Sequence, residues 1–505
     1  MKEIRPYLVA FSAVVSFLAF PPFPLGPVIF ISLVPLLLAI DGLAPYRAFK
    51  FGYLWGVIFY AGMVYYIAWV TIPGMIATVL ILALIPATSM LIYSRLAAKL
   101  PSLAMLSIPV YFLTWNWLLT KSDLNYPWTD IGYSLSYFLP LIQAAEIGGV
   151  YLISLCIFVV NILVFKSISE SPVKSWSGRS RSMIIAVIII LSLYSYGVVR
   201  IRDLRNDLPE DTLTVGMVQG NITKDIKWNR DGLQVSFDRY FSLSSRAVAD
   251  GAELLVWPET AIPTYLAQEP GNMTMVTSFV DSIDTPLLTG VVYYTVDSLG
   301  EYVYFNSAML LEPQKTGYQL YSKIHLVPMS EKIPFSGKVK KLKDIHLGQA
   351  DFTSGVQMTV FNTDGLDFST LICFESVFPG FTREFTRLGA RMLVVITNDM
   401  WFGNTSLYEQ HAMMAVFRAI ENRVPVVRAA NTGVSMAVDK SGCILAKSST
   451  FTEEYLVATI HPETSKSLYN KSGDFIPMVS APVALICLII AFWRRKGYIH
   501  ERYVE

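Results

Sequence analysis

The sequence predicts a bundle of about eight membrane-spanning α-helices joined to one globular domain of alternating helices and strands. Two observations of composition lead to this prediction. Of the 505 residues, 53% are hydrophobic and only 16% are charged, whereas roughly a quarter of the residues in soluble domains are charged. The long apolar runs are concentrated before about residue 199, while residues 200 to 472 have the mixed composition of a globular protein. We therefore expect the first part of the chain to face lipid and the second to fold in water.

The membrane spans are predicted from the length of the apolar runs, because a helix needs about 20 mainly apolar residues to cross the hydrocarbon core. We expect a bundle within 1–199, a domain at 200–475, one further span and a tail at 494–505. The predicted spans are 7–23, 26–41, 51–70, 75–93, 102–120, 140–165, 182–199 and 476–493. The first span is expected to be retained rather than cleaved as a signal, since no small-residue cleavage site follows it.

The orientation of the spans is predicted from lysine and arginine, which are in excess in cytoplasmic loops. One side of the alternating path carries Lys2, Arg5, Arg47, Lys50, Arg95, Lys99, Lys166, Lys174, Arg179, Arg181, Arg494, Arg495 and Lys496. The loops on the other side carry little besides Lys121. We therefore expect both termini in the cytoplasm and the domain at 200–475 on the extracytoplasmic face.

The domain is expected to be layered α/β, because short β-branched runs alternate in it with helical stretches. Strands are predicted at 212–218, 253–257, 286–294, 304–312, 317–323, 368–373, 391–397, 425–430, 434–438, 443–447 and 455–460. Helices are predicted at 232–250, 272–283, 379–388 and 406–423. Helices interleaved with apolar strands indicate sheets that are buried between helical layers.

Three polar or reactive residues lie at the ends of predicted strands, where catalytic side chains often collect. Glu259 ends Leu-Leu-Val-Trp-Pro-Glu, Lys323 ends Tyr-Gln-Leu-Tyr-Ser-Lys, and Cys373 ends Ser-Thr-Leu-Ile-Cys. Each residue alone has a non-catalytic explanation, since charged side chains at strand ends are usually solvated and a cysteine after apolar residues is usually part of the core. Together they supply a base, a cation and a nucleophile, which are the groups that acyl transfer requires.

Other arrangements of reactive groups have weaker support. A Cys–His–acid site is one alternative, because the domain contains His325, His346, His411 and His461, although none lies in a motif that requires a base. No metal is expected, since no His-x-x-x-His or Cys-x-x-Cys spacing occurs. No cofactor is expected either. The net charge of +1 and the lack of a basic stripe give no reason to expect nucleic acid as a partner.

The motifs around these residues resemble the nitrilase superfamily of carbon–nitrogen hydrolases. The matching motifs are Val218-Gln219-Gly220-Asn221, Val256-Trp257-Pro258-Glu259-Thr260, Lys323-Ile324-His325-Leu326-Val327-Pro328, Cys373-Phe374-Glu375, Thr397-Asn398-Asp399-Met400-Trp401-Phe402-Gly403 and Arg428-Ala429-Ala430-Asn431-Thr432-Gly433. With about eight spans and a domain between the last two, the whole chain resembles the membrane-embedded branch of that superfamily, the bacterial apolipoprotein N-acyltransferases.

The resemblance implies a nitrilase-like αββα sandwich that carries a Glu259–Lys323–Cys373 triad. It also implies that the protein lies in the inner membrane of a bacterium. Glu331 matches a further glutamate of the family's site, and Glu375 is expected to support it. The implied reaction passes a fatty acyl chain from a phospholipid, through a thioester on Cys373, to the amino group of a lipoprotein's N-terminal diacylglyceryl-cysteine. In this scheme Glu259 is the general base and acid, and Lys323 with a backbone N–H near Phe374 stabilises the oxyanion.

Both substrates implied by the resemblance are lipids held in the bilayer, so a site next to the headgroups avoids the cost of extracting acyl chains, about 0.8 kcal/mol per CH₂. Trp228, Trp401, Phe374 and Phe402 are candidates for an apolar entrance, with core packing as the ordinary explanation for the two phenylalanines. Two other functions stay open. A membrane-tethered amidase would use the same triad on a small amide. A transporter or scaffold would be expected to carry charges inside its spans, and these spans are almost free of charged residues, with Glu146 the main exception.

Overall fold

The computed structural model describes residues 3–169, 176–227, 229–333 and 352–493. The predicted tail at 494–505, Trp228 and His346 lie outside these residues. The chain divides into two compact units. One unit comprises Met1–Ser122, Tyr126–Val199 and Asp474–Glu505, and the other comprises Asp123–Asn125 and Arg200–Gly473.

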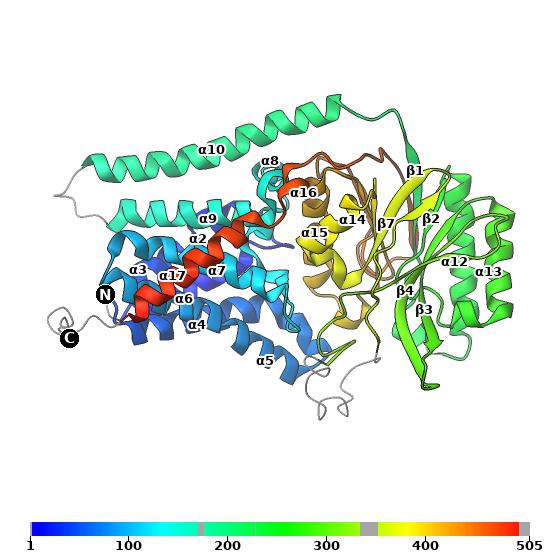
Figure 1. Ribbon diagram of the computed structural model, residues 1–505, viewed down its shortest axis with the longest axis horizontal. Coiled ribbons are helices and arrows are strands. Elements are labelled where there is room, and N and C mark those ends of the chain that lie inside the picture. The colour runs from blue at the N-terminus through cyan, green and yellow to red at the C-terminus, as the bar shows by residue number, and fades with distance from the viewer. Residues whose placement is uncertain (1–2, 170–175, 228, 334–351, 494–505) are drawn as a thin grey trace. The chain divides into compact units, whose positions relative to one another are not determined.

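The first unit is helical (Figure 1). Its helices are α1 (Arg5–Leu18), α2 (Ile29–Ser32), α3 (Val34–Ile40), α4 (Pro45–Val64), α5 (Ile72–Leu82), α6 (Leu84–Ala97), α7 (Pro101–Leu119), α8 (Leu139–Ile142), α9 (Ala145–Ser169), α10 (Trp176–Asn206, which continues into the second unit) and α17 (Phe475–Phe492). Within the described residues, five helical segments are long and apolar enough to cross a membrane: Pro45–Trp69, Ile72–Ala97, Ala145–Ser169, Gly178–Asn206 and Phe475–Phe492. Three shorter apolar segments accompany them, Arg5–Leu18, Gly26–Ile40 and Leu103–Leu119. The chain is thus a membrane protein, with helices where the apolar runs predicted them.

The predicted span at 26–41 is divided at Leu33, between α2 and α3, two residues before Pro35, which has no N–H to donate to the preceding turn. Asn161 of α9 satisfies the groups exposed at this break. Its Oδ1 accepts a hydrogen bond from Leu33 N at 2.9 Å, and its Nδ2 donates to Ile29 O at 2.9 Å. These are the two groups that an unbroken helix would pair with each other. The Asn161 side chain therefore replaces the backbone hydrogen bond that is lost at the break.

The second unit contains two six-stranded sheets within the residues that the structure describes. The first sheet has the order β12-β1-β2-β3-β4-β5 and the second has the order β11-β10-β9-β8-β7-β6. The strands of the first sheet are β12 (Glu454–Ile460), β1 (Leu213–Gln219), β2 (Leu254–Val256), β3 (Leu287–Val296), β4 (Tyr302–Leu311) and β5 (Gln319–Ser322). The strands of the second are β11 (Ile444–Lys447), β10 (Met436–Val438), β9 (Val426–Ala430), β8 (Leu393–Thr397), β7 (Leu366–Ile372) and β6 (Phe361–Thr363).

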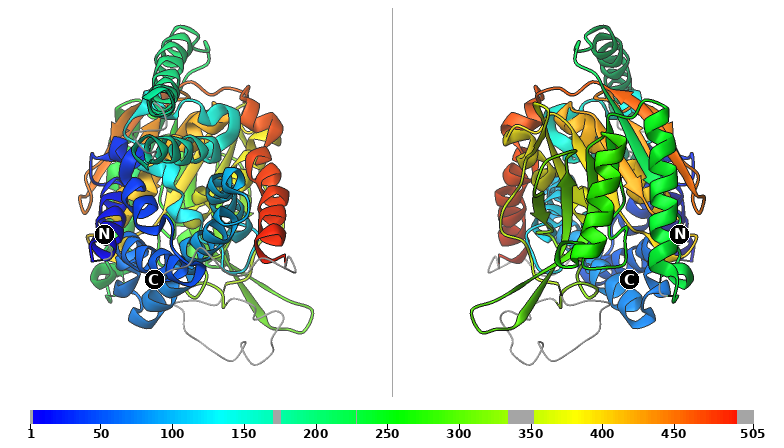
Figure 2. Two further views of the ribbon diagram at one scale, coloured as in Figure 1. Left: turned by 90° about the vertical axis from the view of Figure 1, so that its left-hand side faces the viewer. Right: turned by 90° about the vertical axis from the view of Figure 1, so that its right-hand side faces the viewer.

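Helices cover the outer faces of both sheets, so that the layers follow the order α-β-β-α. Helices α12 (Gly232–Ala249) and α13 (Pro270–Ile283) lie side by side over the first sheet (Figure 2). Helices α14 (Pro379–Arg387) and α15 (Leu407–Asn422) pack on the second sheet, while β1 contacts β9 between the sheets. The predicted nitrilase-like sandwich is therefore confirmed.

The sequence alone did not indicate the three-residue edge strand β6 or the short helix α11 (Lys224–Lys227). The central strands of each sheet run parallel: β1, β2 and β3 in the first, and β7, β8 and β9 in the second. Parallel strands bring their carboxyl ends to the same edge of a sheet. In the second sheet this arrangement places the segments that follow β7 and β8 at one edge.

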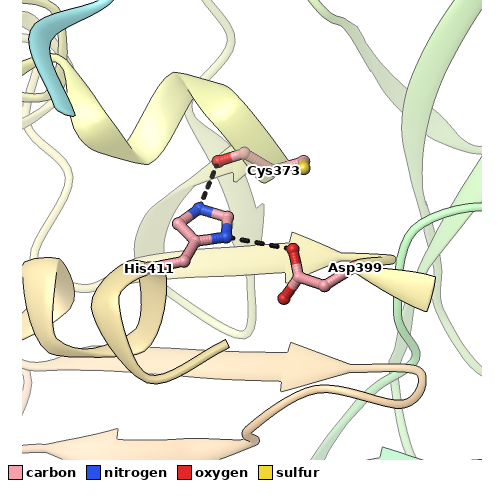
Figure 3. A group of neighbouring side chains, drawn as sticks. All are labelled: Cys373, Asp399 and His411. Carbon is pink, nitrogen blue, oxygen red and sulfur yellow. Dashed lines mark hydrogen bonds and ion pairs between the residues drawn. The ribbon is translucent and has the colours of Figure 1, made fainter. Parts of the chain in front are cut away.

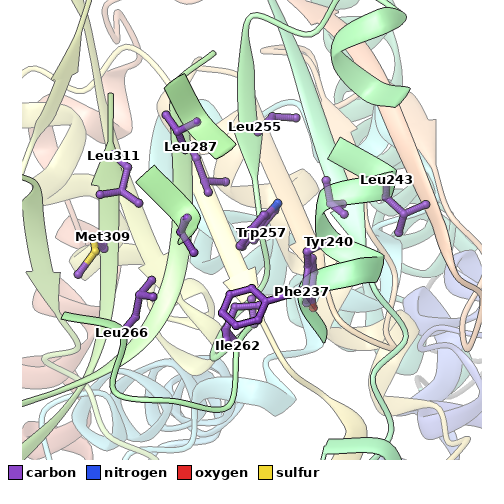
Figure 4. Packing of buried hydrophobic residues seen from close by; sticks show 14 of the residues in the cluster. Phe237, Tyr240, Leu243, Leu255, Trp257, Ile262, Leu266, Leu287, Met309 and Leu311 are labelled. Atoms are coloured by element: carbon purple, nitrogen blue, oxygen red, sulfur yellow. The ribbon is translucent and has the colours of Figure 1, made fainter. Parts of the chain in front are cut away.

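A cluster of buried apolar side chains fixes α12 and α13 on the first sheet (Figure 4). Its central member is Trp257, which is fully buried and lies just before the Pro258-Glu259 segment. Its ring packs on Tyr240 with centroids 5.0 Å apart, and its Nε1 donates to Ser244 Oγ at 2.8 Å. Because the indole N–H is satisfied, the ring can be buried without the cost of an unpaired donor. This packing fixes the chain immediately before Glu259.

Candidate functional site

The structure brings Glu259, Lys323 and Cys373 together from three strand ends. Glu259 follows β2 by three residues, Lys323 follows β5 directly, and Cys373 follows β7 directly. Lys323 is 1% exposed and Glu259 is 7% exposed, whereas Cys373 keeps partial exposure. The three groups are close enough for the charges of Glu259 and Lys323 to change the pKa of the Cys373 thiol. The site thus combines a desolvated acid–cation pair with a cysteine residue that is partly exposed.

Lys323 is shared between two carboxylates. Its Nζ lies 3.7 Å from Glu259 Oε1, 2.9 Å from Glu331 Oε1 and 2.8 Å from Glu331 Oε2. Glu331 also accepts a hydrogen bond from Val327 N at 2.9 Å. Burial lowers the pKa of the Lys323 ammonium, but the negative charges of Glu331 and Glu259 outweigh this effect and raise it. Lys323 is therefore a fixed cation in this site.

The Glu259 carboxylate is held by two donors besides Lys323. Asn306 Nδ2 donates to its Oε1 at 2.7 Å and the backbone N–H of Asn398 donates to its Oε2 at 2.9 Å. Asn306 also donates to Glu331 Oε1 at 3.0 Å and so links the two carboxylates. Sequence reasoning missed Asn306, although a single amide within the apolar run of β4 is a signal that could have identified it.

The pKa values of the acid and of the thiol are both raised. Burial raises the pKa of Glu259, and Glu331 adds to this, while Lys323 and the two hydrogen bonds oppose it. Burial also raises the pKa of the Cys373 thiol, with a further contribution from the charge of Glu259 and an opposing one from Lys323. At neutral pH the proton therefore stays on sulfur in the resting site, since a buried thiolate beside a carboxylate is unfavourable.

Cys373 has an unusual backbone conformation, with φ of 52°, at the junction of β7 and the 3-10 helix η7 (Cys373–Val377). Few residues other than glycine adopt positive φ, and such strain persists only where the surroundings enforce it. Glu375 enforces it in part, because its Oε2 accepts a hydrogen bond from Ile372 N at 2.8 Å. This turn presents the thiol at the end of the sheet.

Glu375 also joins the Cys373 turn to the segment that follows Lys323. It is fully buried, and its Oε1 accepts hydrogen bonds from Tyr321 Oη, Ile324 N and His325 N at 2.7, 2.7 and 3.1 Å. Burial raises the pKa of Glu375 to about 7, although these donors favour the carboxylate. The residue is a structural link between two parts of the site.

A second group of reactive side chains lies behind Cys373. One ligand atom each from Cys373, Asp399 and His411 lies within 4.8 Å of the others. Figure 3 shows, however, that the imidazole meets the carbonyl oxygen of Cys373 and that the sulfur points away from it. Arg428 Nη2 lies 2.8 Å from Asp399 Oδ2 and 3.1 Å from His411 Nδ1, where a metal ion shared by these two residues would have to bind. This group is suited to holding the backbone rather than to binding a cation.

The other histidines considered from sequence have different surroundings. The His325 ring stacks on Phe378 with centroids 4.6 Å apart, and His461 Nδ1 contacts Pro209 O at 3.0 Å. A Cys–His pair would require an imidazole nitrogen bonded to the thiol, and His411 is instead bonded to the Cys373 carbonyl. This contact therefore gives no support to His411 as the base for the thiol.

The expected entrance residues differ in burial. Phe374 is 5% exposed and packs edge-on against Phe378, which favours a packing role. Trp401 and Phe402 are partly exposed, and the Lys224 ammonium lies 4.0 Å from the centre of the Trp401 ring. Trp228 lies outside the described residues.

Lys227 is a further residue of the site that sequence reasoning missed. It is 7% exposed, and its Nζ donates to Thr260 O at 2.7 Å and Thr260 Oγ1 at 2.9 Å. Burial lowers the pKa of Lys227 to about 8, while the charge of Glu259 opposes this. Thr260 has positive φ, 47°, so Lys227 restrains a strained residue next to Glu259.

Known proteins resemble both parts of the chain. The carbon–nitrogen hydrolase family profile matches residues 214–470, and the profile of the apolipoprotein N-acyltransferase N-terminal domain matches residues 12–163. Apolipoprotein N-acyltransferase of Geobacter metallireducens is 33% identical over 512 residues, covering 98% of this chain and 97% of the relative. That of Chlorobaculum tepidum is 29% identical over 510 residues, covering 95% of each.

Among solved structures, the carbon–nitrogen hydrolase from Helicobacter pylori G27 is 16% identical, with a TM-score of 0.38. The match covers 57% of this chain and 97% of that one.

Proposed function

Because the chain belongs to the apolipoprotein N-acyltransferase family and carries a carbon–nitrogen hydrolase domain, we propose that it transfers a fatty acyl chain through a thioester on Cys373. The acyl chain passes from a membrane phospholipid to the amino group of an N-terminal diacylglyceryl-cysteine. The observation that carries this proposal is the buried Glu259–Lys323 pair beside the Cys373 thiol in a chain with membrane helices. A phospholipid is the acyl donor and a diacylglyceryl-modified apolipoprotein is the acceptor.

In the first step Glu259 accepts the thiol proton and Cys373 Sγ attacks the ester carbonyl carbon of the phospholipid. Negative charge develops on the carbonyl oxygen, where the Lys323 ammonium and the Phe374 N–H stabilise it. Collapse of this intermediate breaks the ester C–O bond, and Glu259 returns the proton to the departing lysophospholipid oxygen. Glu331 assists by keeping Lys323 charged and in place.

In the second step the amine of the acceptor attacks the thioester carbonyl. Glu259 takes a proton from the attacking nitrogen, the C–S bond breaks, and the proton passes to the departing sulfur. The products are an amide and the free Cys373 thiol. The same carboxylate therefore serves both half-reactions, which agrees with its raised pKa and with the two donors that hold it.

The distribution of positive charge in the sequence supports the proposed placement in the membrane. The excess of lysine and arginine on one side of the spans supports cytoplasmic termini and an extracytoplasmic catalytic domain in a bacterial inner membrane. We propose domain limits of 1–199 for the helical bundle, 200–475 for the catalytic domain, 476–493 for the last span and 494–505 for a cytoplasmic tail. Both lipid substrates would then reach the site without leaving the bilayer.

The test is a transfer assay in vesicles that contain a phospholipid with a labelled acyl chain and a diacylglyceryl-cysteine peptide. We expect the purified protein to form the amide-linked, labelled peptide and Cys373→Ala to form none. Release of labelled fatty acid to water with no labelled peptide would contradict transfer and would favour the hydrolytic alternative, a membrane-tethered amidase.

A further inference from the structure

The carbonyl group of Cys373 is held by a buried polar network that the proposed reaction does not use. His411 Nε2 of α15 lies 3.2 Å from Cys373 O, and Ser376 Oγ donates to the same oxygen at 2.8 Å. Both side chains are at least 98% buried. A second contact from α15 lies seven residues further on, where Arg418 Nη1 donates to Val377 O at 3.4 Å. Helix α15 therefore holds both ends of η7.

The held carbonyl belongs to the same planar peptide unit as the N–H of Phe374. In a trans peptide the C=O and the N–H point in opposite directions, so fixing one fixes the other. The Cys373 oxygen points toward the imidazole and the sulfur points away from it (Figure 3). The Phe374 N–H therefore points away from His411, as a donor to an oxyanion beside the sulfur must. A hydrogen bond to the carbonyl also polarises the peptide and strengthens its N–H as a donor.

The protonation of His411 follows from its partners. Cys373 O can only accept, so Nε2 must carry a proton for its contact to be attractive. The same nitrogen lies 3.0 Å from Ser376 Oγ, whose hydroxyl donates to Cys373 O and whose oxygen can accept from Nε2. Arg428 can only donate, and its Nη2 lies 3.1 Å from His411 Nδ1. Asp399 Oδ1 lies 3.1 Å from the same nitrogen, but this carboxylate already accepts from Arg428 at 2.8 Å and from Thr397 Oγ1 at 3.1 Å. Burial and the charge of Arg428 lower the pKa of His411, so the ring holds one proton.

We propose that His411 is a positioning residue: as the neutral tautomer protonated at Nε2, it donates to the Cys373 carbonyl and thereby aims the Phe374 N–H at the oxyanion. Asp399 and Arg428 fix the orientation of the imidazole. This inference rests on the proposed function, in which an oxyanion forms on the acyl group bonded to Cys373. It assigns the buried Asp–His pair to the backbone of the nucleophile and not to proton transfer from the thiol.

The test compares His411→Gln with His411→Asn in the full-length protein in phospholipid vesicles. The glutamine amide reaches the position of Nε2 and can donate to the carbonyl, whereas the asparagine amide reaches only the position of Nδ1. We expect His411→Asn to slow acylation of Cys373 about 10- to 100-fold, within the range for a weakened oxyanion donor. His411→Gln should keep the rate within about fivefold of the unmodified protein, since the donor is restored.

A second measurement separates positioning from proton transfer and from general misfolding. Alkylation of Cys373 by iodoacetamide needs a reactive thiol but develops no oxyanion, so both variants should be alkylated at the rate of the unmodified protein. Their thermal unfolding midpoints, measured in the same preparations, show whether the fold is kept. A parallel fall of alkylation and acylation, without rescue by glutamine, would overturn the inference.

The outcome also separates this inference from the proposed function. Normal acylation by His411→Asn, with an acyl adduct on the unmodified protein, would overturn only the role of His411. Failure of the unmodified protein to form any acyl adduct on Cys373 would overturn both.

Discussion

Lys323 Nζ lies 3.7 Å from Glu259 Oε1 in a part of the domain where both side chains are more than nine-tenths buried. An isolated ion at such a depth would be strongly unfavourable, and a pair at this distance offsets only part of the cost. Glu331 at 2.8 Å is a further partner of the cation, and Asn306 at 2.7 Å and the Asn398 N–H at 2.9 Å are further partners of the carboxylate. The site is therefore a coupled set in which each member changes the proton affinity of the others.

The first prediction concerns the pH dependence of Cys373 acylation. Glu259 acts as the base in its ionised form, so the rate falls as pH falls through its pKa. Because burial raises this pKa above the ordinary value of 4.5, the acid limb of the rate profile should lie above pH 4.5. Asn306→Ala removes a hydrogen bond that lowers the pKa, and should move the limb to higher pH. The rate of Cys373 acylation, measured at a series of acid pH values, gives the acid limb of both proteins. An acid limb at the same pH in Asn306→Ala and in the unmodified protein would contradict the role of Glu259 as the base.

The second prediction concerns Glu331→Gln, which removes one of the two charges next to Lys323. The charge of Glu331 raises the pKa of Glu259, so its removal should move the acid limb to lower pH, opposite to Asn306→Ala. The variant should also lose about 2 kcal/mol or more of unfolding free energy, because a buried cation loses a partner. Asp211→Asn is the control, since that carboxylate is 69% exposed and pairs with Arg391, which is 27% exposed. Its loss should stay under about 1 kcal/mol in the same denaturant titration.

The third prediction concerns Glu375→Gln. The amide keeps the shape of the side chain but brings an N–H toward groups that now donate to the carboxylate, among them Ile372 N and Ile324 N. One buried donor is left unpaired, and we expect a loss of about 1 to 3 kcal/mol in unfolding free energy. Acylation should fall as well, because the link between the Cys373 turn and the Lys323 segment is weakened. Retention of both stability and activity would show that this link is dispensable.

The fourth prediction concerns Lys227→Met, which keeps the apolar length of the side chain and removes its donors to Thr260. Without them the strained Thr260 can relax, and Glu259 beside it moves with it. We expect acylation to slow about tenfold, corresponding to about 1.4 kcal/mol of transition-state stabilisation. Lys224→Met is the matched control on the same short helix and should change the acylation rate less than Lys227→Met, since Lys224 contacts Trp401 and not Thr260.

The sequence predicted the parts of the site that depend on local pattern. Glu259, Lys323 and Cys373 each lie at or just after the end of an apolar strand, a position that the local sequence pattern identifies. The helical segments of the first unit follow from long apolar runs for the same local reason.

The remaining features depend on tertiary contacts that no local pattern shows. Asn306 contacts Glu259 across 47 positions of sequence, and His411 contacts the Cys373 carbonyl across 38. From sequence His411 is only one of four histidines in the domain, with no sign that it binds a carbonyl and not the thiol. The short strand β6, with three residues, has too few positions for an alternating pattern to be recognised.

The most direct test of the proposed mechanism is the intact mass of the protein after incubation with phospholipid alone, quenched in acid. The mechanism predicts an added acyl group on Cys373 that neutral hydroxylamine removes, that Cys373→Ala lacks, and that disappears when a diacylglyceryl-cysteine peptide is added. Formation of the N-acylated peptide by Cys373→Ala, or an acyl group found only on another residue, would contradict it.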